Sequence, residues 1–350
     1  MMTEIRYPFP EPPAPGAAIE IRPGLLWLRL PLPMALDHVN VYALADPEGW
    51  TLIDCGFYSP AMVAEWDKLL AGPLAARPVR RVLITHHHPD HIGMAGWFVA
   101  RGAELMISRT AWLTARMLVL DEEARPTPEA LAFWHRAGLS GAEIARRAGE
   151  RPFNFADCVH PLPPGFTRLS EGQGLHLGGR DWQIRLGQGH APDQVTLWSG
   201  DLVLGADQLL PSISPNIGVS VLEPEADPLA EWLASCTRLS GFASPGQLVL
   251  PGHKLPFTGL GLRLAQLIEN HHSALGRLSD WLTEPRRAIE CFQPLFRRSI
   301  GPREQGLALA ETLAHLNYLY LRGQITRAAD PEGVMLWQRS APCDRAASER

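Results

Sequence analysis

The chain has 350 residues, a formal net charge of -5 and 46% hydrophobic residues. This length allows one large domain or two, with a substantial buried core. The acidic balance gives no electrostatic reason to expect a nucleic acid as partner, and no apolar run is long enough to cross a membrane.

The beginning of the chain carries no basic stretch followed by an apolar run, so we expect no signal peptide. The cysteines are widely scattered and form no C-x-x-C pair, which argues against a disulfide framework or a thiolate metal site. We therefore expect reduced thiols and a cytoplasmic protein. The cysteines are Cys55, Cys158, Cys236, Cys291 and Cys343.

The first half of the chain alternates between strand and helix patterns. Residues 1–20 are rich in Pro and Ala and are expected to form an extended arm. A Ser cap and apolar residues at helical spacing predict a helix at 59–71, and Gly102 is expected to end a second helix. Strands are expected at 24–32, 38–46, 50–56, 80–85 and 103–108, with an Asp-Pro-Glu-Gly hairpin turn before the third. This alternation predicts an α/β domain.

Residues 109–150 differ, because their pattern is helical throughout, broken at Pro126 and Pro128 and capped at Ser140. Strands are expected again at 174–179, 181–187, 194–199, 202–207 and 247–252. From about 262 onward the pattern is helical. We therefore expect a catalytic domain over 21–261 with a helical insertion at 109–150, followed by a mostly helical region over 262–350.

The segment ITHHHPDHIG, residues 84–93, concentrates side chains that bind metals. In its H-x-H-x-D-H pattern, His86 and His88 can point one way while Asp90 and His91 turn toward a second position. Imidazole and carboxylate are the ligands that Zn, Fe and Mn sites use. A surface run or a tag would lack the Pro-Asp interruption and the place between a strand and a helix. His87 is expected to point away from both metal positions.

Three further strand ends carry a candidate ligand, each after an apolar run and a Gly: His190, Asp207 and His253. The run WSGDLVLGAD offers two aspartates, Asp201 and Asp207. A hairpin at residues 199–201 would bring His190 beside Asp207. It would leave Asp201 at the turn, roughly 20 Å or more away at about 3.3 Å per strand residue. We therefore predict that Asp207 is the ligand.

With these motifs in this order, residues 20–260 resemble the metallo-β-lactamase superfamily. The segment LIDCG at 52–56 is similar to the Leu-Ile-Asp-Thr-Gly segment that precedes the histidine motif in that superfamily. The resemblance implies an αβ/βα four-layer sandwich, with two mixed sheets face to face, helices outside and the site at one sheet edge.

The resemblance also implies roles for individual residues. His86, His88 and His190 would bind a first metal ion. Asp90, His91 and His253 would bind a second, and Asp207 would bridge both. Asp54 would support the histidine loop, and Gln194 occupies a place where some members carry His.

The tail segment ETLAHLNYLYLRGQI resembles the C-terminal region of the β-lactamase-like protein 2 group, with the recognition helix and wing entry of a winged-helix unit. Plain amphipathic packing remains open as the alternative. Adjacent His271 and His272 would point in different directions from a helix, so at most one could reach the pocket, and a solvated helix face is the simpler expectation. Lys254 is a candidate for the pocket rim.

The ligand set and the resemblance predict a dinuclear-metal-dependent hydrolase that uses a metal-bound hydroxide. Its cofactors would be two divalent ions, Zn²⁺ first, with Fe and Mn left open. Asp90 would also act in catalysis, by orienting the nucleophile or shuttling its proton. Two alternative functions are a mononuclear iron persulfide dioxygenase and a non-enzymatic binding module.

We expect first a hydrolase of an acyl thioester, ester or lactone. The second expectation is a nuclease or phosphodiesterase. The helical insertion could cap an apolar pocket with Trp112, Met117, Leu118 and Trp134, although residues at this spacing are more typical of core packing. We expect a small-molecule substrate, no nucleic acid and no membrane, and we leave a homodimer open.

Overall fold

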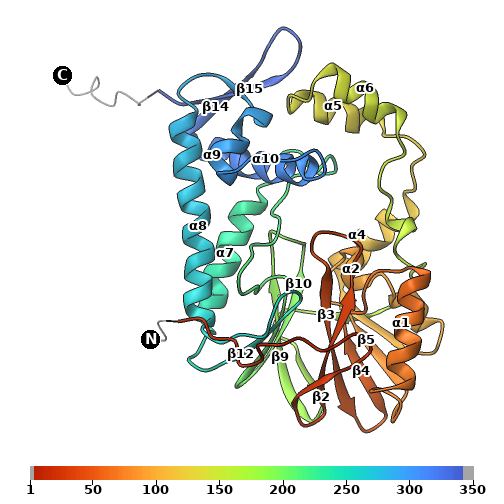
Figure 1. The fold of residues 1–350 in the computed structure, drawn as a ribbon. Coiled ribbons are helices and arrows are strands. Elements are labelled where there is room, and N and C mark those ends of the chain that lie inside the picture. The colour runs from red at the N-terminus through yellow and green to blue at the C-terminus, as the bar shows by residue number, and fades with distance from the viewer. Residues whose placement is uncertain (1–3, 342–350) are drawn as a thin grey trace. The chain divides into compact units, whose positions relative to one another are not determined.

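The computed structural model describes residues 4–341, with helices and strands labelled in chain order in Figure 1. These residues form two compact units. Unit 1 contains residues 4–123, 153–215 and 234–267, and unit 2 contains residues 124–152, 216–233 and 268–341. Four of the cysteines are buried and free, as expected, while Cys343 lies outside the described residues.

Unit 1 contains a seven-stranded mixed sheet whose strands lie in chain order. The first four strands pair antiparallel, and the later neighbours pair parallel. The turn between the third and fourth strands falls at Pro47 and Glu48, as the Asp-Pro-Glu-Gly sequence predicts. The strands are β1 (Ile19–Arg22), β2 (Leu25–Pro31), β3 (His38–Asp46), β4 (Gly49–Ile53), β5 (Val79–Leu83), β6 (Glu104–Ser108) and β7 (Thr167–Leu169).

A five-stranded sheet, also in unit 1, has the order β12-β11-β10-β9-β8. Ser199 pairs with Leu202 across a two-residue turn, where Gly200 takes the left-handed conformation at a φ of 54°. The predicted hairpin is therefore present, and β11 then pairs parallel with β12. The strands are β8 (Gly174–Leu177), β9 (Arg180–Gly187), β10 (Gln194–Ser199), β11 (Leu202–Ala206) and β12 (Leu248–Pro251).

The two sheets share one apolar core. Trp27 and Tyr42 of the larger sheet and Trp182 of the smaller sheet belong to a single buried cluster. The opposite face of the larger sheet packs in a second cluster, in which Trp66 of α1 meets Phe98 of α3 edge to face. Strand residues alternate between these two clusters because successive side chains point to opposite faces. The helices that follow the first strands are α1 (Pro60–Ala71), α2 (Pro89–Ile92), α3 (Ala95–Val99) and α4 (Arg109–Leu120).

Two longer helices each run from one unit into the other: α7 (Pro228–Ser240) and α8 (Leu260–Trp281). Their unit 1 halves lie beside the smaller sheet, where Gln188 N donates to Ser235 Oγ over 2.9 Å (Figure 1). Helices therefore accompany both sheets, and unit 1 has the expected layers. Helix α7 was not predicted from the sequence, although Asp227 before Pro228 is a typical helix start. The Asp227 side chain accepts from Ala230 N.

Unit 2 combines helices with a small sheet. Its three strands have the order β13-β15-β14, and β14 and β15 form a hairpin directly after the long helix α10. The sequence pattern predicts helices here, and the resemblance implies a wing after the recognition-like helix, but β13 was not predicted. The elements are α5 (Pro128–Arg136), α6 (Gly141–Gly149), β13 (Arg286–Arg287), α9 (Phe292–Phe296), α10 (Gln305–Leu321), β14 (Ile325–Ala329) and β15 (Met335–Arg339).

The expected boundaries differ from this division at the helical segment 109–150. Its first helix, α4, belongs to unit 1, whereas α5 and α6 belong to unit 2. Within unit 2, Arg147 on α6 reaches Gln305, and Gln305 in turn donates to Glu143 over 2.8 Å. These contacts tie α6 to α10, which periodicity cannot predict because it reports only local structure.

Within residues 4–341, no helix is both long and apolar enough to cross a membrane.

Asn40 on β3 is the buried polar residue that links the larger sheet to the loop after β12. Its Nδ2 donates to Pro251 O and Lys254 O, each over 2.9 Å, and its Oδ1 accepts from Trp27 Nε1. Asn40→Ala should leave Trp27 Nε1 unpaired, while Pro251 O keeps the bond from Tyr42 and Lys254 O keeps the bond from Arg29. With the lost packing, this should destabilise the protein by about 2–4 kcal/mol.

Denaturant unfolding measures this loss as a lower free energy of unfolding. The exposed Asp181→Ala is the control and should change stability by less than about 0.5 kcal/mol. A value for Asn40→Ala as small as the control would contradict the role assigned to this residue.

Candidate metal centre

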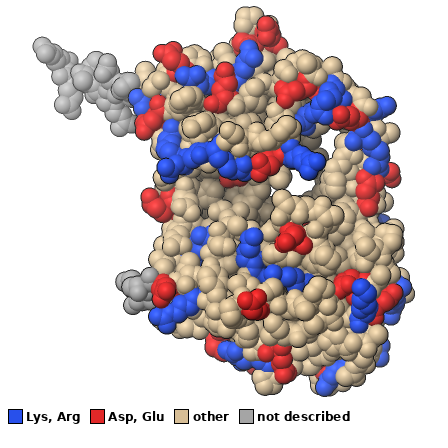
Figure 2. All heavy atoms as spheres, in the orientation of Figure 1, with Lys and Arg blue, Asp and Glu red and all other residues tan. Residues whose placement is uncertain are grey.

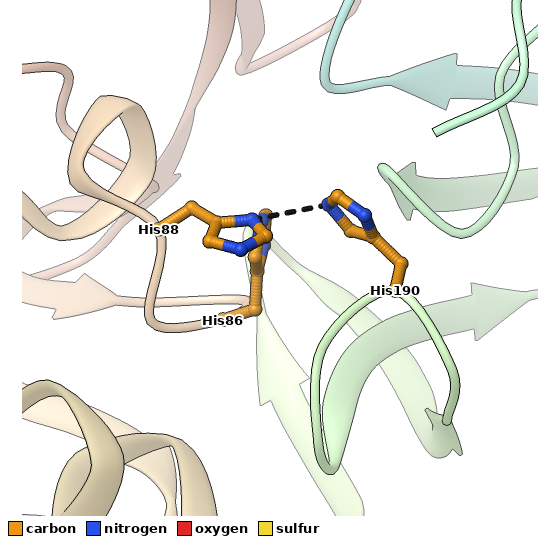
Figure 3. Close-up of side chains that lie close together, drawn as sticks. All are labelled: His86, His88 and His190. Carbon is orange, nitrogen blue, oxygen red and sulfur yellow. Dashed lines mark hydrogen bonds between the residues drawn. The ribbon is translucent and has the colours of Figure 1, made fainter. Parts of the chain in front are cut away.

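Three histidines from two loops form the first ligand group. His86 and His88 lie on the loop after β5, and His190 lies on the loop between β9 and β10, with the rings turned toward one another (Figure 3). His86 Nε2 lies 3.0 Å from His88 Nδ1, and His88 Nδ1 lies 3.1 Å from His190 Nε2. The three nitrogens lie within 4.8 Å of one another, so one ion can contact all of them.

A second ligand group lies beside the first. His91 and Asp90 are carried by the short helix α2, and His253 follows β12. His253 Nε2 lies 3.3 Å from Asp90 Oδ2, and His91 Nε2 lies 3.5 Å from the same oxygen. These atoms again converge on one point.

Asp207 lies between the two groups, at the end of β11. Its Oδ2 is 3.6 Å from His190 Nε2 and 3.2 Å from His253 Nε2, and its Oδ1 is 3.5 Å from His91 Nε2. One carboxylate thus faces ligands of both groups, as expected for a bridge. Asp201 instead lies in the β10–β11 turn, paired with Arg22 and Arg180.

Asp54 holds the histidine loop in place from the end of β4. Its Oδ1 accepts from Thr85 N over 2.8 Å, and its Oδ2 accepts from Thr85 Oγ1 and from His91 Nδ1 over 2.9 and 2.8 Å. Its backbone is left-handed at a φ of 63°, which only a few residue types adopt readily. With Nδ1 of His91 donating to Asp54, Nε2 is left as the nitrogen that faces the site.

Two further histidines, His253 and His86, are oriented in the same way. His253 Nδ1 lies 2.7 Å from the carbonyl oxygen of His38, and His86 Nδ1 lies 3.0 Å from Thr85 Oγ1. A proton on each of these Nδ1 atoms leaves Nε2 free for a metal. Gln194 also reaches His86 Nδ1, at 3.3 Å. An amide oxygen in that position would accept from Nδ1–H, and the two amide orientations differ only by rotation.

Burial and the neighbouring imidazoles keep the pKa of His86 and of His88 well below 6.5, so both rings are neutral ligands at neutral pH. Burial also lowers the pKa of His91, but Asp90, Asp207 and Asp54 together raise it well above 6.5. The pKa of His253 reaches about 9 because Asp207 and Asp90 outweigh its burial. The carboxylates of the site thus favour positive charge on the groups beside them.

Two buried atoms of the centre show whether its residues fit a metal ion. His91 Nε2 and Asp207 Oδ1 are inaccessible to solvent and have no hydrogen-bond partner within the described residues, although both point into the group of ligands. An unpaired buried polar atom normally costs about 1–3 kcal/mol. Cations would pair with both atoms and would replace the protons on His91 and His253. The residues present therefore fit divalent metal ions.

All seven residues predicted as ligands lie in this centre in unit 1. His87 points elsewhere, as predicted, because its ring stacks on Phe155 at a centroid distance of 6.2 Å. Asp193 was not among the predicted site residues. It accepts from Thr110 Oγ1 and from Gln188 Nε2 and so positions the loop of His190. The Pro-Asp pair shortly after His190 could have suggested such a loop anchor.

The comparisons with known proteins agree with this geometry. The model of the metallo-beta-lactamase superfamily matches residues 34–204, and the model of the metallo-beta-lactamase-like C-terminal domain matches residues 275–340. A beta-lactamase domain protein from Burkholderia ambifaria is 34% identical, with a TM-score of 0.86, over 96% of this chain and 97% of its own. The chain belongs to the metallo-β-lactamase superfamily.

Two further relatives extend over most of the chain. A metallo-beta-lactamase family protein from Thermus thermophilus is 28% identical, with a TM-score of 0.75, over 92% of this chain and 100% of its own. "Probable metallo-hydrolase YqjP" of Bacillus subtilis is 27% identical over 85% of this chain and 93% of its own length. The expected superfamily, the α/β sandwich class and the general enzyme class, a metal-dependent hydrolase, are thereby confirmed.

A shorter match connects this superfamily member with nucleases. Ribonuclease Z of Pseudomonas putida (strain ATCC 700007) is 26% identical over 53% of this chain and 60% of its own length. The chain therefore spans less than two thirds of that relative.

Asp207→Ala should lose at least one metal equivalent per chain, because the variant removes the carboxylate that faces both ligand groups. Asp201→Ala is the matched control, since Asp201 lies in the turn and its side chain pairs with arginines. Elemental analysis after reconstitution measures both. Metal loss in the Asp201 variant with full content in the Asp207 variant would refute the assignment.

Asp54→Asn should weaken metal binding by about 10- to 100-fold, because asparagine tolerates the left-handed backbone but cannot accept all three hydrogen bonds. Competition with a chromogenic chelator measures the affinity. Asp181→Asn, at an exposed position, should bind metal like the unchanged protein. An unchanged affinity for Asp54→Asn would show that the histidine loop needs no such support.

Proposed function

We propose that the protein is a dinuclear-metal hydrolase that cleaves an acyl thioester, ester or lactone. The carrying observation is the seven-residue centre, in which two three-residue groups share Asp207. Two divalent ions, with Zn²⁺ as the first candidate and Fe or Mn as alternatives, would supply a nucleophilic hydroxide at neutral pH and Lewis-acid stabilisation of the developing oxyanion.

Asp90 is the residue best placed to handle the proton of the attacking water. Its side chain is 18% exposed, whereas the side chains of His91 and His253 beside it are almost fully buried. Burial opposes its ionisation, but His91 and His253 outweigh this, so the pKa of Asp90 is lowered and its carboxylate is charged at neutral pH. It can therefore both contact a metal ion and accept a proton.

Apolar side chains on α4, a helix hydrogen-bonded to the His190 loop, support an acyl substrate. Leu113, Met117 and Leu120 are each more than 40% exposed and follow one another along a single face of α4. The start of α4 is tied to the His190 loop through Thr110 and Asp193. An acyl chain could lie on this apolar face while its carbonyl reaches the centre.

Phe153 is another exposed apolar residue of unit 1, and it contacts an aromatic neighbour of the histidine loop. Exposed Phe153 packs edge to face on Phe155, the residue that stacks on His87. This aromatic pair adds apolar surface beside His87 on the histidine loop, and apolar surface favours an acyl substrate over a charged one.

The aromatic residues expected to line a single cap behave differently from one another. Trp112 stacks on Phe166 at 4.7 Å in the core of unit 1, so it serves packing there. Trp134 belongs to unit 2, where Arg147 lies over its ring. The proposed acyl surface therefore relies on Met117 and its neighbours on α4.

The alternative substrate is a nucleic acid phosphodiester, which the partial likeness to ribonuclease Z supports. The helix expected to act as a recognition helix, α10, has most of its central residues buried, which weighs against groove binding by that helix. Acidic and basic side chains are interspersed on the face drawn in Figure 2. The acyl substrate is thus preferred.

A substrate panel tests the proposal: acyl-CoA, acyl-glutathione, lactone, β-lactam and single-stranded RNA, each with metal-loaded protein. Thioester, ester or lactone hydrolysis should be measurable and should disappear with a chelator and in His88→Ala. Asp90→Asn should lower kcat by about 10²-fold or more. Turnover of RNA alone would favour the nuclease alternative instead.

Acyl-chain preference tests the proposed apolar surface on α4. Met117→Ser should raise KM more for long acyl chains than for acetyl substrates, because each buried CH₂ contributes about 0.8 kcal/mol. Leu222→Ser, at an exposed leucine of unit 2, is the matched control and should change neither value. Equal effects of Met117→Ser on short and long chains would refute an acyl surface on α4.

A further inference from the structure

A second concentration of metal-ligating side chains lies in unit 2 and contains none of the residues assigned to the dinuclear centre. His271 on α8 faces Glu311 and His315, which occupy the same face of α10 four residues apart. One ligand atom of each residue lies within 4.8 Å of the others. Both histidines are almost fully buried, at 4% and 2% exposure. This burial distinguishes the group from the exposed acidic clusters that are common on protein surfaces.

The spacing of the two imidazoles is that of a shared ion. His271 Nδ1 lies 3.2 Å from His315 Nε2. Two nitrogens bound tetrahedrally to one zinc ion at about 2.0–2.1 Å are separated by about 3.3 Å. The corresponding nitrogen pairs of the first ligand group in unit 1 lie 3.0 and 3.1 Å apart. The nitrogen–nitrogen distance in unit 2 is therefore similar to those of the first ligand group in unit 1.

Hydrogen bonds orient two members of the group, His315 and Glu311. His315 Nδ1 lies 2.8 Å from the backbone oxygen of Glu311, so the proton of this ring sits on Nδ1 and Nε2 offers its lone pair to His271. Asn216 Nδ2 donates to Glu311 Oε2 over 3.1 Å and holds the carboxylate. His271 Nε2 is buried without a hydrogen-bond partner among the described residues. This arrangement of a backbone carbonyl behind a histidine is typical of metal ligands.

The charge balance of the group also favours a cation. Burial lowers the pKa of His271 to about 3 and that of His315 to about 4, so both rings are neutral at neutral pH. Burial raises the pKa of Glu311 to about 7, although the hydrogen bond from Asn216 opposes this shift. Arg277, a neighbouring cation, donates to the backbone oxygens of Pro294 and Leu295 and to Ser273 Oγ. A divalent ion would neutralise the carboxylate and use both neutral imidazoles.

We propose that His271, Glu311 and His315 bind one further divalent transition-metal ion of the zinc type, independent of the dinuclear centre. Two imidazoles and a carboxylate form a ligand set that zinc, iron and manganese accept. Three protein ligands leave a fourth position for water or for an added ligand. The ion would also join α8 to α10 within unit 2. The competing interpretation is a hydrogen-bonded histidine pair beside a protonated glutamic acid, with no ion.

The test counts metal equivalents in the full-length protein, using Zn²⁺ and Co²⁺ reconstitution followed by removal of loosely bound metal. The unchanged protein should hold three equivalents. Glu311→Gln and His315→Ala should each hold two, and the loss should appear with both metals. His272→Ala is the matched control, because His272 is exposed on the same helix and should leave three equivalents in place.

The same variants in an Asp207→Ala background separate this site from the catalytic one. Glu311→Gln should again remove one equivalent there, whatever remains at the dinuclear centre. The near-isosteric glutamine keeps the fold, and circular dichroism checks it. A cobalt titration of the unchanged protein, with d–d absorption resolved for a third equivalent, needs no variant at all. Equal metal content for Glu311→Gln and His272→Ala, or saturation of the unchanged protein at two equivalents, would overturn the proposal.

Discussion

The rest of the centre depends on the hydrogen bonds that the carboxylate of Asp54 accepts. This carboxylate is buried at the end of β4, and it accepts hydrogen bonds from the backbone and hydroxyl of Thr85 and from His91. A single side chain thereby joins the ends of two parallel strands to helix α2. A buried carboxylate is stable only when its acceptor positions are filled, so the loop between β5 and α2 has one favoured conformation. That conformation turns the ligand nitrogens inward.

The sandwich supplies the remaining ligands through the same geometric constraint. β10 and β11 form a hairpin, and β11 pairs parallel with β12, so His190, Asp207 and His253 reach one edge of the smaller sheet. Asn40 and His38 on β3 connect that edge with the larger sheet through Pro251, Lys254 and His253. The core between the sheets therefore sets the distance between two ligand groups that lie far apart in the sequence. Ligands held on strand ends keep their separation because the sheets cannot shift without breaking the core.

Both clusters of ligands follow one electrostatic principle. Buried imidazoles remain neutral, whereas buried carboxylates need a positive partner, and the described residues supply too few side-chain cations at either place. In unit 1, protons on His91 and His253 or metal ions compensate the negative charge of the carboxylates. In unit 2, the carboxylate that needs a positive partner is that of Glu311. A protein that carries an N/O ligand set in each unit would link metal supply to both its chemistry and the packing of its C-terminal helices.

The sequence by itself determined most elements of unit 1 and predicted the residues that meet in its centre. Local rules sufficed there: the Ser59 cap, the turn at Pro47 and Glu48, and the hairpin around Gly200 each follow from adjacent residues. The choice of Asp207 over Asp201 also needed only strand length and one turn. The resemblance supplied the role of Asp54, for which spacing alone carries no signal.

Only the tertiary structure decided which helices belong together and what lies between them. The segment 109–150 looks uniform in its periodicity, yet α4 packs in unit 1 whereas α5 and α6 pack in unit 2. His271 and His272 were indistinguishable as neighbours, and the fold buries one against His315 while exposing the other. His315 lies 44 residues further along the chain, so no local pattern could pair it with His271. Periodicity records which face of a helix is apolar, whereas the partner of that face depends on long-range packing.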